Sequence, residues 1–174
     1  TYNSEAQDLL TGPATVTGSV GGEWTVTYSL EEAGEYTSEV PQGEDAGTYT
    51  VYVRATNPNY TEALSTSVTA TISPAKLTAE LEHQEKSFDG NADVLDEQVS
   101  VTLRTPFDGD DVSASIATGD VKYATSAVHE DGDLSARAES VKLSGEDAKN
   151  YVVAGVTGTG TITPQTINRI KVQG

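Results

Sequence analysis

The stretch Trp24-Thr25-Val26-Thr27-Tyr28-Ser29-Leu30 alternates apolar and polar side chains with a period of two. This alternation predicts a β-strand with one buried face, and it puts Trp24 and Tyr28 on the core side. Residues 49–54 alternate in the same way, with Tyr49 and Val51 on one face. We therefore expect a sheet with one face packed on a core.

Short alternating stretches separated by turn residues continue through the rest of the chain. Further predicted strands lie at residues 65–72, 77–81, 99–103, 112–116, 135–143, 151–156 and 158–162. The chain has 24 Thr but only 10 Leu, and β-branched side chains favour strands over helices. We predict an all-β chain of two tandem immunoglobulin-like β-sandwich domains. A β-grasp-like unit, with a short helix at 4–10 or 93–98 on the sheet, is the alternative.

An internal repeat indicates two copies of one unit. Thr71-Ile72-Ser73-Pro74 recurs as Thr161-Ile162-Thr163-Pro164, and Asn59-Tyr60 recurs as Asn150-Tyr151. The spacing predicts one domain at 1–74 and a second at 75–174. By position, 165–174 corresponds to the start of the second domain, so we expect a terminal strand or the start of a following repeat. Thr1 is not a natural start, and we expect the chain to be part of a longer protein.

Composition excludes several classes of function. The chain carries 27 acidic and 10 basic residues, a net charge of −17, and it has no Cys. Without Cys there is no disulfide framework, thiolate metal site or Cys nucleophile. The acidic balance disfavours nucleic acid, because phosphate contacts need a positive surface. No apolar run approaches the length of a membrane span.

Two long stretches resemble known domain families. The first half, "TYNSEAQ…TVTYSL…YTSEVPQGEDAGTYTVYVRATNPNY…TATISPAKL", resembles the bacterial surface-repeat family called the MBG domain. The second half, "KSFDGNADV…GDDVSASIATGDV…VKLSGEDAKNYVVAGVTGTGTITP", resembles its relative, the YDG-type repeat. The resemblance implies tandem immunoglobulin-like domains in secreted or wall-attached, adhesin-like bacterial proteins. It implies a spacer or stalk function, and it supplies no ligand residues for this chain.

The acidic turns are candidate cation sites. Asp89-Gly90-Asn91-Ala92-Asp93 has oxygen ligands at alternate positions, as a calcium loop does. The loop has Val94 where the calcium loop needs Gly and Ser100 where it needs Glu. We therefore interpret it as an Asx turn that starts a strand. Two other acidic turns contain Asp108, Asp110 and Asp111 and then Asp131 and Asp133. No metal site is predicted from them.

No group of residues predicts catalysis, so we expect no enzyme and no cofactor. His83 and His129 lie far apart, each beside an acid, with no partner at a metal or triad spacing. Residues 155–160 are Gly-rich but lack the Lys and helix of a phosphate loop, and they predict a hairpin turn. Lys76 or Lys86, with an Asn and an acid nearby, are weighed for an isopeptide bond, and no pairing stands out.

Aromatic residues crowd the first domain. Tyr49 follows Asp45-Ala46-Gly47, a spacing typical of a tyrosine corner. Tyr52 faces away from Tyr49 and is the aromatic expected to be exposed. An exposed Tyr52 or Tyr36 would be the place to look for a bound sugar ring.

The expected function is a non-catalytic spacer in an extracellular bacterial surface or secreted protein. The alternative is a module that binds carbohydrate or a host protein. Expected partners are neighbouring repeats of the same chain, with glycan or host protein under the alternative. We expect no nucleic acid, no membrane contact within this segment and a monomer.

Overall fold

The computed structural model describes residues 1–18, 21–104 and 106–173. The chain divides into two compact units. Unit 1 comprises Thr1–Ala75 together with Lys149–Tyr151, and unit 2 comprises Lys76–Ala148 and the chain from Val152 onward. The return of three residues to unit 1 is a feature that the sequence repeat does not predict.

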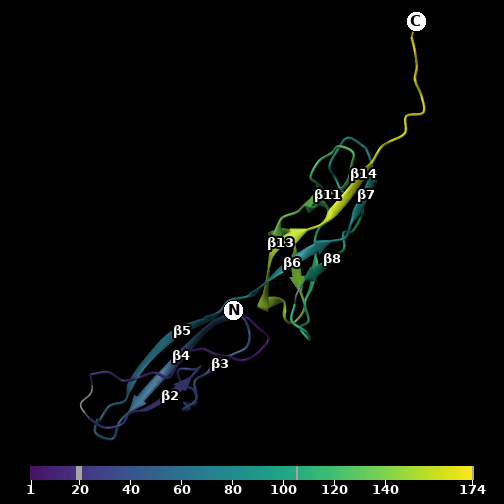
Figure 1. Ribbon diagram of the computed structural model, residues 1–174. Helices are drawn as coiled ribbons and strands as arrows, with labels where there is room; N and C mark the ends of the chain where they lie inside the picture. The colour runs from purple at the N-terminus through teal and green to yellow at the C-terminus, as the bar shows by residue number, and fades with distance from the viewer. Residues whose placement is uncertain (19–20, 105, 174) are drawn as a thin grey trace. The chain divides into compact units, whose positions relative to one another are not determined.

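Unit 1 is built on a three-stranded antiparallel sheet with the order β2-β4-β5 (Figure 1). Its strands are β2 (Thr25–Ser29), β4 (Gly47–Thr56) and β5 (Leu64–Ile72). The long central strand β4 pairs on one side with β2 and on the other, over nine residue pairs, with β5. A small two-stranded ladder joins β1 (Gln7–Asp8) to β3 (Gln42–Gly43).

Unit 2 has three sheets, of order β10-β11-β14-β7, β13-β6-β8 and β12-β9. Its strands are β6 (Ala75–Leu81), β7 (Gln84–Ser87), β8 (Val101–Arg104), β9 (Ser113–Ser115), β10 (Lys122–Tyr123), β11 (His129–Ser135), β12 (Lys142–Ser144), β13 (Tyr151–Thr157) and β14 (Thr159–Thr163). The first residues of β6 and β13, Ala75 and Tyr151, are those that belong to unit 1. Three 3-10 turns, η1 (Thr118–Asp120), η2 (Ala138–Ser140) and η3 (Ala148–Asn150), complete the described elements. Strands β7 and β14 run parallel.

Each unit has its own core. In unit 1 a small cluster of Tyr28, Val51 and Val53 is buried, as the alternation of β2 and β4 predicts. Unit 2 has a larger cluster that includes Leu81, Val121 and Ile162. The prediction of an all-β, sandwich-like chain is confirmed.

Several local predictions were wrong. No helix forms at 4–10 or 93–98, so the β-grasp alternative loses the helix on which it depends. The strand expected at 135–143 is interrupted by η2. The segment 165–173 forms no strand, so the terminal strand expected there is not formed, while the alternative, the start of a following repeat, stays a prediction; Gly174 lies outside the described residues. No helix in the described part of the chain is long and apolar enough to cross a membrane.

Candidate interaction surface and the predicted ligand sites

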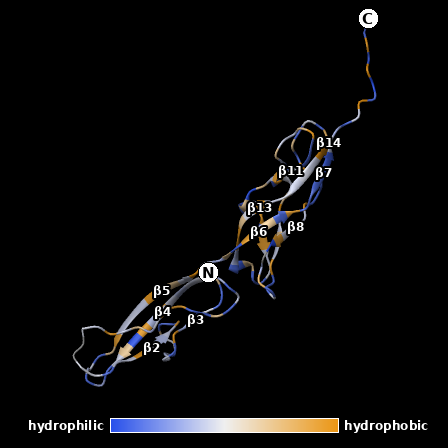
Figure 2. Cartoon of the chain, in the orientation of Figure 1, coloured by the Kyte–Doolittle hydropathy of each residue, from blue (hydrophilic) through white to orange (hydrophobic). Residues whose placement is uncertain are grey.

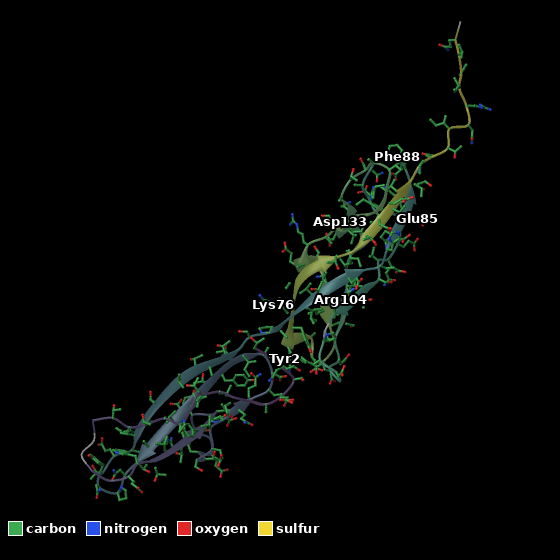
Figure 3. All side chains as sticks on the ribbon, in the orientation of Figure 1. Tyr2, Lys76, Glu85, Phe88, Arg104 and Asp133 are labelled. Carbon is green, nitrogen blue, oxygen red and sulfur yellow. The ribbon has the colours of Figure 1, made fainter. Side chains whose placement is uncertain are left out.

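A buried lysine fills the loop that most resembles a cation site. Lys86 lies on β7, and its side chain is only 1% exposed. Its ammonium donates to Asp89 Oδ1 at 2.8 Å, to the Asn91 carbonyl oxygen at 2.8 Å and to Asn91 Oδ1 at 3.0 Å. The ring of Tyr123 lies 5.3 Å from the ammonium, within the range of a cation–π contact. Figure 3 labels Glu85 and Phe88, the residues one before and two after Lys86 in the sequence.

The loop has the predicted Asx-turn geometry. The Asn91 amide donates to Asp89 Oδ1, and the Asp93 amide donates to Asn91 Oδ1. The Asp93 carboxylate accepts a hydrogen bond from Lys122. Both loop carboxylates are therefore already paired with lysines, and the ammonium of Lys86 holds the oxygens that a metal ion would bind.

The charges around this lysine shift two pKa values. The hydrogen bond from Lys86, aided by the Asn91 amide, lowers the pKa of Asp89 below its ordinary value. Burial raises the pKa of Tyr123 above its ordinary value, and nearby acidic residues raise it further. Both shifts favour a carboxylate and a neutral phenol around the ammonium at neutral pH.

The same geometry bears on the isopeptide bond weighed for Lys86 or Lys76. Lys86 lies beside an Asn and an Asp, as that chemistry requires, but its nitrogen is joined to their oxygens at 2.8 to 3.0 Å. These are the distances of hydrogen bonds and not of a covalent bond. Lys76 lies exposed on β6.

The other acidic turns make local contacts. Asp111 and Asp147 join two loops, because each accepts a backbone hydrogen bond from the other's segment. Asp131 and Asp133, expected in a turn, lie within strand β11 (Figure 3 labels Asp133). Among the described residues, no group of three or more His, Asp or Glu is placed to hold a metal ion.

Each histidine has a local partner. His83 Nδ1 lies 2.9 Å from Thr159 Oγ1, and His129 Nδ1 lies 2.7 Å from the Ala127 carbonyl oxygen. The Gly-rich segment 155–160 does not close the hairpin that the sequence predicts. Gly158 instead separates β13 from β14, which belong to different sheets.

The aromatic residues of unit 1 are largely used within the unit. The Tyr49 hydroxyl donates to the Asp45 carbonyl oxygen at 2.8 Å, which confirms the contact predicted from the tyrosine-corner spacing. Tyr36 donates to the Glu32 carbonyl oxygen, and the Arg54 guanidinium lies 4.1 Å from its ring centre. Tyr52 is half-buried, so it is not the freely exposed aromatic that the sequence predicts.

Strand β5 is where the core face of unit 1 is open. Directly opposed residues of an antiparallel pair share a face, so Leu64 and Val68 lie on the same side of the sheet as their buried partners Ala55 and Val51. Ala55 and Val51 are 5% and 0% exposed, whereas Leu64 and Val68 are 51% and 45% exposed. The core face is therefore covered over β4 and exposed over the first part of β5, from Leu64 to Val68. Towards the end of the strand it is covered again, because Ala70 is half-buried and Ile72 is 5% exposed.

The outer edge of β5 is also unpaired within the described residues, because β5 ends its sheet. None of its nine residues is charged and none is Pro, although edge strands are commonly protected by charges or Pro. Beside it lies a hollow of about 310 Å³, lined by residues 14–17, by Val26, Val53 and Ala55, and by residues 64–66. The edge, the two exposed apolar side chains and the hollow together form what we call the β5 surface.

Among the described residues these features define an all-β module in which the acidic loops bind neighbouring side chains and backbone, and in which β5 ends its sheet. The chain belongs to the YDG domain family, which matches residues 73–159, half of the chain. No curated protein and no solved structure matches the chain.

The family match corrects four sequence-based predictions. The family found is the YDG domain alone, so the identification of the chain as an adhesin-type MBG and YDG pair is not retained. The predicted spacer function was wrong, as was its alternative, a module that binds carbohydrate or a host protein. The description of the protein as a secreted adhesin is not supported either. The exclusion of nucleic acid is withdrawn as well, because the YDG name is shared with a module that binds methylated DNA. The extracellular location stays a prediction.

Proposed function

We propose that this chain is a non-catalytic interaction module that binds an extended segment of a partner protein by strand addition at β5. The observation that carries the proposal is that β5 exposes apolar side chains on its core face and has no neighbouring strand along its outer edge within the described residues. Strand addition gives affinity through main-chain hydrogen bonds and specificity through alternate side chains. The β5 surface offers both, a free row of main-chain groups and two exposed apolar side chains beside a hollow.

We also propose that the chain has no catalytic activity. It is supported by the contacts described above, in which the lysine, histidine and carboxylate groups singled out from the sequence mostly bind neighbouring side chains or backbone. One of these contacts does bring a hydroxyl to an imidazole, that of Thr159 with His83. The Asp131 carboxylate lies 3.8 Å from the same ring nitrogen, Nδ1, so the three groups do not have the arrangement of a triad, in which the acid and the hydroxyl bind opposite ring nitrogens.

The test uses a display library of random extended peptides, selected against the full chain. We expect enrichment of sequences that alternate apolar and polar residues, and loss of their binding to Val68→Lys, which puts a charge on the open face. Ser67→Lys is the matched control, because Ser67 is exposed on the same strand and faces the other side of the sheet. Equal binding to both variants, or no enrichment, would refute the proposal.

Nucleic-acid binding is a second candidate, favoured by the shared family name. The chain has 27 acidic and 10 basic residues, so phosphate contacts would have to come from local clusters of cations. Fluorescence anisotropy with matched methylated and unmethylated duplexes at two salt concentrations tests it. Affinity that falls with salt and differs between the duplexes would establish this function, and equal absence of binding would remove it.

A further inference from the structure

The segment after β14 is the most exposed apolar stretch of the chain. Ile167, Ile170 and Val172 are 83%, 91% and 86% exposed. Residues 165–173 form no strand or helix. Figure 2 shows apolar and polar residues following one another along this segment. Covering side chains that are exposed to this extent is favourable, because it removes apolar surface from water.

Residues 169–172 of this segment have the pattern of an amphipathic strand. In an extended chain, residues two apart share a face, so Ile170 and Val172 would lie on one face and the cations Arg169 and Lys171 on the other. The segment 165–173 contains no acidic residue. From Arg169 to Val172 one strand face is therefore apolar and the opposite face is positive, whereas Ile167 falls on the face of Arg169 and Lys171.

Unit 1 has the complementary surface. Its β5 surface exposes Leu64 and Val68 along a free edge. Residues 1–75 carry ten acidic side chains and one basic side chain, whereas residues 165–173 carry two cations and no acid. These local charges are complementary and favour the orientation of the contact, although two copies that each carry a net charge of −17 repel one another as wholes. Ile170 and Val172 facing inward would cover the open core face and leave Arg169 and Lys171 toward solvent beside the acidic unit.

We propose that residues 165–173 of one copy of this chain add as a strand to the β5 edge of a second copy. This inference rests on the proposed function and names the partner. The contact joins two different surfaces, so it is heterologous. After one contact has formed, one copy still has its β5 edge available and the other still has its segment 165–173 available. Further copies can therefore add at both ends, and the contact builds open chains of copies.

A mixing experiment with the full chain tests the inference. The first variant, Val68→Lys, loses the edge and keeps the segment. The second, Ile170→Asp with Val172→Asp, loses the segment and keeps the edge. Sedimentation velocity over micromolar to millimolar concentrations should show wild-type chains that grow with concentration, each variant alone as a monomer, and an equimolar mixture that stops at a dimer.

The outcomes separate the inference from the proposed function. A monomeric wild type, or a mixture that stays monomeric, overturns the inference. If selected peptides still bind in a manner that depends on Val68, the proposed function stands without it. Association that survives both variants places the contact elsewhere and also overturns the inference. Ser67→Lys serves again as the charge control and should associate as the wild type does.

Discussion

Replacement of Lys86 should show that the buried ammonium holds the loop of unit 2 together. Lys86→Met keeps most of the apolar stem and leaves the loop oxygens without their donor, for a loss of about 1 kcal/mol of unfolding free energy. Lys86→Ala also removes three buried methylene groups at about 0.8 kcal/mol each. The total loss for Lys86→Ala is therefore about 3 kcal/mol.

The loss of stability in variants of Lys86 and of its partner Asp89 should depend on which charged group is left buried without its partner. In Asp89→Ala the ammonium of Lys86 stays, 1% exposed, with one acceptor missing. In Lys86→Met the carboxylate left behind is 32% exposed and can be hydrated. We therefore expect Asp89→Ala to destabilise unit 2 more than Lys86→Met does. Asp89→Asn is the matched control, because it keeps an oxygen acceptor for the turn and loses only the charge.

The assay follows from the placement of the single tryptophan. Trp24 lies in unit 1, so its fluorescence follows unit 1, and far-UV circular dichroism follows both units. Urea unfolding should show a shifted circular-dichroism transition with an unmoved Trp24 transition. A Lys86→Met variant that loses more stability than Asp89→Ala, or as much as Lys86→Ala, would refute the reasoning.

Three further predictions use the same readouts. Asn150→Ala removes a side chain that is 0% exposed and hydrogen-bonds to Asp45 and to the Ala46 amide. Its loss of about 2 kcal/mol should appear in the Trp24 transition, and a change confined to unit 2 would contradict this. Gly145→Ala puts a Cβ against the Asp111 carbonyl oxygen at a φ of +113°, and circular dichroism should show a loss of at least about 2 kcal/mol. Because the pKa of Asp89 is lowered in the folded chain, its stabilising effect is complete above the ordinary carboxyl pKa and is lost as the pH falls below about 4. Acid titration of wild type against Asp89→Asn should show a smaller loss in the variant.

The strands that the sequence predicts are those in which local pattern and tertiary pairing agree. In β2 and β4, alternate apolar residues face one core, so the period of two is visible in the sequence. Strand β11 (His129–Ser135) contains Asp131-Gly132-Asp133, which reads as a turn. Its partner β14 fixes it as a strand, with Gly132 opposite Gly160 and a register shift before it. No local signal carries that pairing.

The lysine site was missed for a similar reason. In β7 the buried residues are Gln84 and Lys86, so the strand has no apolar face to count. A signal was present, since a Lys three residues before an Asp-Gly-Asn turn can place its ammonium among the turn's oxygens. The open β5 surface could not be predicted for a different reason. The sequence predicts a strand at residues 65–72, but whether anything covers its apolar face depends on residues distant in sequence.

The return of Lys149–Tyr151 to unit 1 has a consequence for how the chain is made. Asn150 bonds to Asp45 and Ala46 across more than one hundred residues of sequence, and the Tyr151 ring lies 5.4 Å from that of Tyr2. During synthesis the first seventy-five residues emerge long before these groups do, and contacts of such long range form slowly. The contacts of unit 1 with Asn150 and Tyr151 can therefore form only after most of unit 2 has been synthesised. A fragment cut after Ala75 should express as a looser domain than the same residues within the whole chain.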